Sequence, residues 1–275
     1  MNRLIGYPDW IKDDEELNDY YKNYVFDSGK YFENYLQCEK EETQRNFEYF
    51  RKPVDKLMWV TGPAIFNANY NPRTNSINLP AGILQSLFYH KDSPHYLNFG
   101  GMGMFIGHEI THGFDDIGRQ FDKDGNLKQW WTDESIEAFV GRAQCIVDQY
   151  DKYNMDECNM TLNGVHTQGE NIADNGGLKE AYRSYRKMVD ETMDGEELRL
   201  PGIGLTQDQM LFVNFAQIWC SKYTEQGARH AILAGGHSPG RYRVEGSISN
   251  LPEFAKVFNC PASSPMNPDK KCTVW

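Results

Sequence analysis

The spacing of apolar and polar residues divides the chain into helical stretches separated by turn-forming residues. Across residues 10–60, aromatic side chains recur three to four positions apart, which is the spacing of one face of an α-helix. This periodicity predicts a helical N-terminal region whose aromatic stripe faces a core. The stripe comprises Tyr20, Tyr21, Tyr24, Tyr31, Phe32 and Tyr35.

The turn-forming pairs Gly62-Pro63 and Asn71-Pro72 end this helical pattern. Two short apolar segments lie between and after them, at Ala64–Tyr70 and Ser76–Leu79. Runs of this length, bounded by turn formers, are typical of β-strands. We therefore expect a small β-sheet here, with the two segments paired as a hairpin.

Beyond the sheet, helical periodicity returns in several stretches. A glycine-rich segment at 100–103 leads into Met104–Gly113, whose composition predicts a buried helix. Further helices are expected at 133–153, 170–188 and 206–223, and a short one near 252–258. The rest of the tail from Gly235 onward is rich in turn formers and is expected to be irregular.

This pattern predicts a mostly α-helical fold with a small β-sheet. Neither an internal repeat nor a linker-like stretch divides the chain, so one domain of residues 1–275 is the simplest organisation. Within it, residues 1–60 would form a helical lead-in and residues 61–275 the core.

The net charge of the chain argues against one class of binding partner, nucleic acid. With 28 basic and 39 acidic residues, the net charge is −11. Nucleic-acid binding requires a basic face for the phosphates, so nucleic acid is not an expected partner. An acidic balance of this kind is typical of a solvated surface.

The cysteines bear on the compartment. No apolar run approaches the ~20 residues of a membrane helix, and the first residues lack a signal-peptide core. Six scattered cysteines without a Cys-x-x-Cys pair nevertheless fit disulfides in an oxidising compartment. A glycosylation sequon at Asn159 agrees with this. We expect an extracellular or cell-surface protein whose targeting segment lies upstream of this chain.

The strongest chemical signal is the sequence His108-Glu109-Ile-Thr-His112. Four residues are slightly more than one helical turn, so both imidazoles project from the same face and can bind one metal ion. Glu109 lies beside them, where it can act as the base for a zinc-bound water. The alternative is a helix that merely carries two histidines.

A catalytic zinc ion needs a third protein ligand, and Glu170 is the candidate. Asp174 follows it by one helical turn, so the two carboxylates share a face. Glu170 would bind the metal and Asp174 would orient a ligand imidazole. An acidic first helical turn is the alternative explanation.

Two residues near the C-terminus could complete such a site. His237 and Arg243 lie in the segment His-Ser-Pro-Gly-Arg-Tyr-Arg. A tetrahedral intermediate carries an oxyanion that needs a donor besides the metal, and His237 is a candidate. Arg243 would anchor a substrate carbonyl. Spacing alone supports these two roles weakly, because a lone loop histidine is usually solvated.

Taken together, these motifs resemble the M13 metallopeptidases, the family of neprilysin and the endothelin-converting enzymes. The resemblance extends from Ile5-Gly-Tyr-Pro8 to Trp275. It rests on Asn67-Ala68, on Pro80–Gln85, on Gly107–Asp116, on Gly169–Gly177 and on His237–Arg243, which occur in the family's order. Glu170 follows His112 by 58 positions, a longer interval than in the thermolysin and aminopeptidase families.

The resemblance implies a thermolysin-like (gluzincin) catalytic domain with one Zn²⁺ per chain. Its ligands would be His108, His112 and Glu170, with Glu109 as the catalytic base. Asp174 and Asp115 would support the ligand histidines. His237 and Arg243 match the residues that stabilise the oxyanion and bind a substrate carbonyl.

The resemblance also implies a peptide-binding cleft. Asn67 and Ala68 would hydrogen-bond the substrate backbone as an edge segment. A pocket for a large apolar residue just after the cut would be walled by Ile83, Phe88, Phe105 and Trp219, for which ordinary core packing is the alternative. The chain departs from the family at Asn69, where an aromatic residue is common.

Beyond the site, the resemblance implies a larger ectoenzyme. Such enzymes carry one N-terminal membrane helix (type II) and a helical N-terminal lobe that restricts substrates to short peptides, and this lobe is largely absent here. Cys145 and Cys272 match a bonded pair. Cys220 and Cys260 match cysteines whose partners lie in the absent part, and a Cys38–Cys158 bond is a guess.

Two hypotheses follow from the sequence. In the first, the protein is a zinc endopeptidase that cleaves oligopeptides on the N-terminal side of apolar residues. In the second, it is an inactive zinc-binding fragment or truncated form that lacks the lobe.

Overall fold

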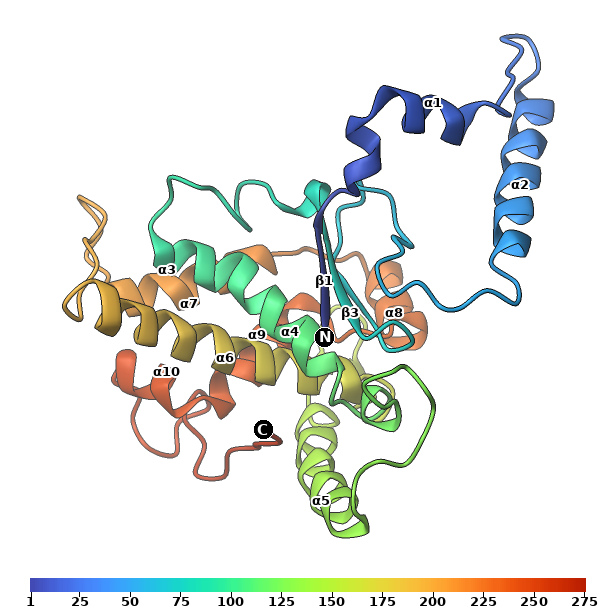
Figure 1. The fold of residues 1–275 in the computed structure, drawn as a ribbon. Helices are drawn as coiled ribbons and strands as arrows, with labels where there is room; N and C mark the ends of the chain where they lie inside the picture. Colours follow the sequence, from blue (N-terminus) through green and yellow to red (C-terminus); the bar gives the residue numbers. More distant parts are fainter.

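A computed structural model describes all 275 residues. Helices dominate and a small sheet lies beside them, which confirms the predicted fold class (Figure 1). The helices are α1 (Asp14–Tyr21), α2 (Tyr31–Glu48), α3 (His95–Asn98), α4 (Met104–His112), α5 (Asp133–Tyr150), α6 (Gln168–Thr192), α7 (Gln207–Ile218), α8 (Glu225–Ala234), α9 (Gly240–Asn250) and α10 (Pro252–Val257).

Shorter helical turns connect several of these helices. Three are 3-10 turns, η1 (Asp9–Lys12), η2 (Ala81–Ile83) and η4 (Gly118–Gln120). A π-helical turn, η3 (Phe99–Gly103), joins α3 to α4, so these elements form one continuous rod. No helix of the chain combines the length and the apolar character that crossing a bilayer requires.

The main sheet has three strands in the order β1-β3-β2. β3 (Ser76–Pro80) pairs in parallel with β1 (Asn2–Gly6) and antiparallel with β2 (Asn69–Asn71). The predicted hairpin therefore exists, although its first strand covers only the end of the expected 64–70 segment. The sequence did not predict β1. A second, two-stranded sheet joins β4 (Asn154–Met155) to β5 (Met160–Thr161).

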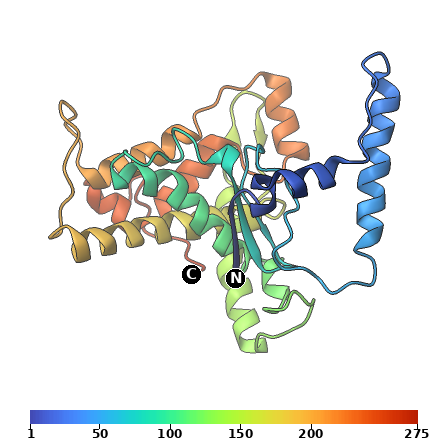
Figure 2. The ribbon, with the colours of Figure 1, turned by 45° about the horizontal axis from the view of Figure 1, so that its top comes forward.

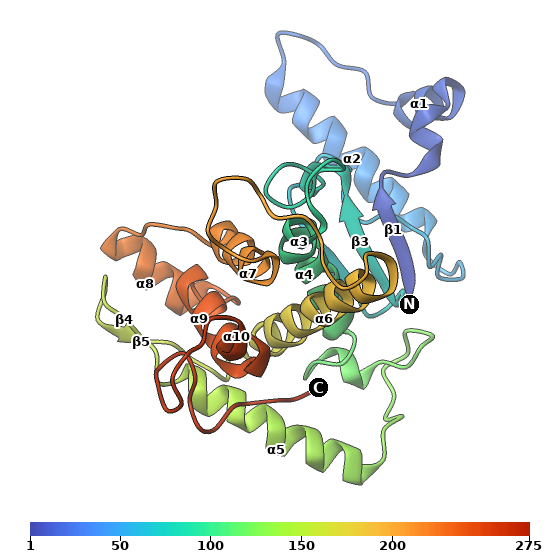
Figure 3. The same ribbon diagram turned by 90° about the vertical axis from the view of Figure 1, so that its left-hand side faces the viewer.

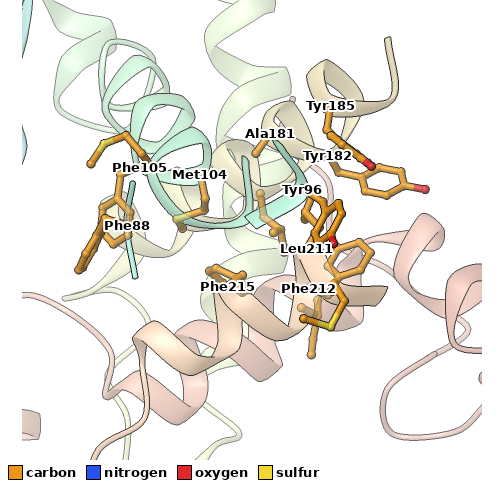
Figure 4. Close-up of a cluster of buried hydrophobic side chains, with 14 of the residues drawn as sticks. Phe88, Tyr96, Met104, Phe105, Ala181, Tyr182, Tyr185, Leu211, Phe212 and Phe215 are labelled. Atoms are coloured by element: carbon orange, nitrogen blue, oxygen red, sulfur yellow. The ribbon is translucent and has the colours of Figure 1, made fainter. Parts of the chain in front are cut away.

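The main hydrophobic core lies where the rod of α3, η3 and α4 meets α6 and α7 (Figure 4). Met104, Leu211 and Phe215 are fully buried there. A second cluster lies beneath α5, where the C-terminal segment packs through Cys272 and Val274. A disulfide joins Cys145 to Cys272, as the family resemblance implied.

The N-terminal helices differ from the prediction. Residues 10–60 are not one helical stretch, because the chain breaks between α1 and α2 and has no regular helix after Glu48. This N-terminal arm, residues 9–60, projects away from the helical body in all three views (Figures 1, 2 and 3). Its aromatic stripe was expected to face a core, but Tyr31 is 84% exposed and Phe32 is 66% exposed.

Two further expectations are wrong, and one helix was not predicted. The tail after Gly235 is not irregular, because α9 occupies residues 240–250 and is largely buried. α8 precedes it in a segment for which no helix was expected. The guessed Cys38–Cys158 bond does not form, since Cys38 lies on the arm and Cys158 is buried beneath α5. Cys220 and Cys260 are also free thiols.

Candidate metal centre and peptide cleft

His108, His112 and Glu170 converge at the point where α4 crosses α6. One potential ligand atom from each residue lies within 4.8 Å of the others. The two histidine Nε2 atoms are 3.0 Å apart. The Glu170 carboxylate oxygens lie 3.3 Å from His108 Nε2 and 3.5 Å from His112 Nε2.

These separations fit a zinc ion. Tetrahedral zinc with bonds of about 2.0–2.1 Å places neighbouring ligand atoms roughly 3.3 Å apart. Two imidazole nitrogens and one carboxylate are also a donor set that catalytic zinc sites use, with the fourth position left for water or substrate. His108, His112 and Glu170 therefore form a zinc-ligand-like group without needing to move far.

A carboxylate lies beside the outer nitrogen of each imidazole. Asp174 Oδ1 lies 2.9 Å from His108 Nδ1, and Asp115 Oδ2 lies 2.6 Å from His112 Nδ1. Asp115 is fixed in turn, because its Oδ1 accepts hydrogen bonds from the backbone N–H groups of Ile117 and Gly118. Partners of this kind set which ring nitrogen faces the metal.

The carboxylates also give the site a negative electrostatic potential. Burial alone would lower the pKa of His112, but Asp115 and Glu170 outweigh it and raise this pKa to about 10. The pKa of Glu170 is raised by burial and lowered more strongly by the surrounding histidines, so it ends far below its usual range. The site thus favours positive charge between these groups, whether a proton or a metal ion carries it.

Glycines allow the two helices to approach closely. A Cβ atom on Gly177 would lie 2.5 Å from the backbone nitrogen of His108, and one on Gly107 would lie 2.8 Å from Gly177. Any side chain at these positions would separate α4 from α6. The Gly107 and Gly177 positions are therefore what brings Glu170 within reach of the histidines.

Arg243 enters the site from α9 and pairs with Asp174. Its Nε and Nη2 donate to the two carboxylate oxygens at 2.7 and 2.6 Å, and both side chains are almost wholly buried. Arg243 Nη2 also lies 3.7 Å from Glu170, and the guanidinium carbon lies 4.0 Å from the centre of the Trp219 ring. Arg243 thereby neutralises a carboxylate that is already committed to His108.

Glu109 and His237 differ in their exposure to solvent. Glu109 is buried on α4, and this burial raises its pKa above the ordinary value. His237 belongs to the loop between α8 and α9 and is 58% exposed. Its Nε2 lies 3.1 Å from Glu170, so the loop brings it to the edge of the metal site.

A cleft of about 680 Å³ runs over this group. Nearly all the residues predicted for the site line it. Asp174 does not, because it lies fully buried behind His108. The lining includes Asn67, Ala68, Ile83, Phe88, Phe105, His108, Glu109, His112, Asp115, Glu170, Trp219, His237 and Arg243.

The backbone at Asn67 and Ala68 leads directly into β2. β2 pairs only with β3 and is therefore an edge of the sheet, next to the cleft. An edge strand presents unpaired backbone N–H and C=O groups that can pair with an extended peptide.

The expected apolar wall is continuous. The Phe105 ring lies 5.0 Å from the Phe88 ring and 5.6 Å from the Trp219 ring, measured between centres. Phe88, Phe105 and Ile83 belong to the main core and also line the cleft. Core packing and cleft lining, which the sequence left as alternatives, both apply to these side chains.

The sequence reasoning missed several cleft residues. Phe66 packs edge-on against Phe88 at 5.2 Å and extends the apolar wall. Asp116 accepts a hydrogen bond from Gln168 Nε2 at 3.1 Å, and His166 lies four residues before Glu170. The position of Asp116 and His166 next to recognised motifs was a usable signal, whereas Phe66 gave none.

Comparison with known proteins places this site in a family. Residues 67–274 match the family described as "Peptidase family M13". Neprilysin-2 of Drosophila melanogaster is 49% identical over 277 residues, which is 100% of this chain and 36% of that protein. Membrane metallo-endopeptidase-like 1 of Mus musculus is 47% identical over 278 residues, again 100% of this chain and 36% of that protein.

A solved structure shares the fold. The zinc metalloprotease ZMP1 of Mycobacterium tuberculosis, in complex with an inhibitor, superposes with a TM-score of 0.88. It is 32% identical, and the match covers 99% of this chain and 41% of that one. The chain spans about a third of the length of the curated relatives that it matches.

Proposed function

The chain belongs to peptidase family M13, and we propose that it carries the catalytic part of a zinc-dependent endopeptidase. The observation that supports this proposal most directly is the convergence of His108, His112 and Glu170 in a cleft lined by Glu109. The substrates would be short peptides, cut on the N-terminal side of apolar residues.

In this proposal His108, His112 and Glu170 hold one zinc ion. A zinc ion in such a site supplies a Lewis acid and lowers the pKa of a bound water to near 7. Glu109 accepts the proton of the attacking water and later returns it to the leaving amine. Asp174 and Asp115 keep the ligand imidazoles oriented while this happens.

The remaining cleft residues bind and orient the peptide. Asn67 and Ala68 continue the sheet edge and pair with the substrate backbone. The apolar wall of Phe88, Phe105 and Trp219 accepts the side chain that follows the cut. His237 and Arg243 donate to the oxyanion and to a substrate carbonyl.

The test separates metal binding from proton transfer. We expect hydrolysis of a quenched fluorescent peptide to stop when zinc is chelated and to return when zinc is added. Glu109→Gln should keep stoichiometric zinc but lose about 10²–10⁴-fold in kcat. Glu225→Gln should match the parent, because Glu225 is an exposed residue of α8 that does not line the cleft. Hydrolysis that survives both chelation and Glu109→Gln would refute the proposal.

A second candidate is an inactive zinc-binding fragment. It is favoured by the N-terminal arm, whose exposed aromatic side chains form an apolar surface that a stable monomer rarely leaves open. We propose that a further segment of the same polypeptide, the N-terminal lobe, covers this arm. Zinc binding without turnover, followed by turnover once the upstream region is supplied, would distinguish this candidate from the first.

An extracellular or cell-surface location is part of the proposal. The Cys145–Cys272 disulfide is typical of an oxidising compartment, and the mouse relative's name places that protein at a membrane. Asn159 is exposed in the turn between β4 and β5, where a glycan could attach. Secreted protein should lose mass on glycosidase treatment, and Asn159→Gln should abolish that loss.

A further inference from the structure

The loop that carries His237 combines an exposed and a buried residue. His237 is 58% exposed, two glycines precede it, and its one charged partner is Glu170, 3.1 Å from its Nε2. Its neighbour Ser238 is only 3% exposed. Pro239 follows as the N-cap of α9, which begins at Gly240. Ser238 is therefore the point at which this loop is attached to the body of the protein.

A chain of buried hydrogen bonds makes the attachment. The Ser238 hydroxyl lies 2.8 Å from Asn171 Oδ1 and 3.3 Å from Thr167 Oγ1. A hydroxyl has one proton to donate, and the shorter distance assigns it to Asn171. Asn171 Nδ2 donates to Thr167 Oγ1 at 2.8 Å, and the Thr167 hydroxyl donates to the Asn163 carbonyl at 3.1 Å.

This network is satisfied at every member and is shielded from water. Asn171 is fully buried, and Thr167 is nearly so. Buried networks whose donors and acceptors are all paired hold their side chains in one arrangement. Ser238 therefore has one defined position relative to α6.

The position of Asn171 links the His237 loop to the metal site. Asn171 directly follows Glu170 on α6, so the loop is attached to the helical turn that supplies a metal ligand. Arg243 is attached to the next turn of the same helix through Asp174. Hydrogen bonds to α6 thus hold in place both residues proposed to contact the reacting carbonyl, His237 through Ser238 and Arg243 directly.

We propose that Ser238, through Asn171, is a positioning residue that holds His237 at the edge of the cleft. The inference rests on the proposed peptidase function and on the role of His237 within it. Hydrogen-bond donors stabilise a developing oxyanion only when they are already in place. A displacement of about 1 Å can cost on the order of 10²-fold in rate.

The first experiment compares three variants of the full chain on the quenched peptide. Ser238→Ala removes one oxygen atom, and we expect kcat to fall about 10–100-fold while KM changes less than about twofold. Ser238→Thr keeps the hydroxyl and should recover most of this loss. Ser249→Ala is the matched control, because Ser249 is a buried serine of α9 whose hydroxyl donates to the Gly246 carbonyl.

A double-mutant cycle tests whether Ser238 acts through His237. In a His237→Ala background, Ser238→Ala should cause no further loss of kcat, because the residue that it positions is gone. An undiminished loss in that background would overturn the proposal. Equal activities of the parent, Ser238→Ala and Ser249→Ala would overturn it as well.

A measurement without turnover separates this inference from the proposed function. In protein labelled at the histidine ring carbons and kept free of metal, NMR relaxation reports the order of the His237 ring. We expect the order to fall in Ser238→Ala and to be unchanged in Ser249→Ala. If the parent hydrolyses nothing, the proposed function fails, yet this measurement still decides the attachment: unchanged order in Ser238→Ala refutes it.

Discussion

The metal-site helices and the N-terminal arm share the same sequence signal, but the former are buried in the core and the latter is exposed to solvent. Both regions showed apolar residues at helical spacing, and both contain helices. α4 packs against α6 through glycines, with Met104 fully buried. On the arm, Phe47 of α2 is 72% exposed.

The difference lies in the partner surface. Helical periodicity indicates that a helix has an apolar face to bury, but it does not indicate which segment packs against that face. The packing partners of α4 are α6 and the π-helical turn η3, and both belong to this chain. On the arm, Trp10 and Arg45 pack against Tyr20, but most of the aromatic stripe stays exposed. We therefore propose an occupant from elsewhere in the polypeptide.

The largest contrast is expected between two phenylalanines. Phe215 is fully buried in the main core, so Phe215→Ala should lower the free energy of unfolding by about 3–5 kcal/mol. Phe47→Ala on the arm should change it by less than about 0.5 kcal/mol. Urea denaturation followed by far-UV circular dichroism measures both, and similar losses would mean that the arm packs on the body in solution.

A slightly smaller effect is expected from the buried ion pair. Asp174→Asn leaves the Arg243 charge without its main partner and should cost about 3 kcal/mol, at the low end because Glu170 remains 3.7 Å away. The exposed Arg229–Glu225 pair is the control, and Glu225→Gln should cost less than about 1 kcal/mol. Thermal melts of the two variants test whether burial makes the difference.

Zinc should stabilise one region and leave the other unchanged. At a zinc concentration a hundred times the Kd, binding adds about 2.7 kcal/mol to the stability of the native state. Hydrogen exchange should slow along α4 and α6, where the ligands lie, and remain as fast on α2. Slowing of both regions by the same factor would show that they unfold as one unit.

The smallest individual effects are expected at two helical glycines. Gly177→Ala places a methyl group against the backbone of α4 and should destabilise the protein by about 1–3 kcal/mol. Gly141 on α5 has open space at its Cβ position, so Gly141→Ala should stabilise by roughly 0.5–1 kcal/mol. Opposite signs of the shift in Tm are the expected result.

The sequence predicted those parts of the molecule whose signal is local. The four-residue spacing in α4 fixes which side chains share a face, and the hairpin breaks at turn-forming residues. The sequence motifs also picked out His108, His112 and Glu170, which the structure brings together as a zinc-ligand-like group. The family match and the fold comparison confirm the family assignment and the fold class.

The missed elements depend on distant contacts. α9 has the sequence GRYRVEGSISN, which carries few apolar residues, yet it is buried against α6, where Arg243 pairs with Asp174. β1 is a strand because it pairs with β3, more than 70 residues away. Neither partner is visible in the local pattern, and the same holds for the absence of cover on the arm.

The pairing of the sheet has a consequence for how the chain is connected. Gly6 pairs with Pro80 and Asn69 with Asn78, so the segment between β1 and β2 starts and finishes beside the same end of β3. Two strand spacings of about 4.8 Å separate its ends, a gap that three or four residues can bridge.

In topological terms the arm is therefore a loop of roughly 60 residues, closed by the sheet. Each doubling of loop length costs about 0.6 kcal/mol of closure entropy, so cutting out residues 10–60 would shorten the loop by two to three doublings and relieve about 1–2 kcal/mol. We therefore expect that residues 10–60 can be removed or exchanged while β1, β3 and the cleft residues Asn67 and Ala68 keep their connections.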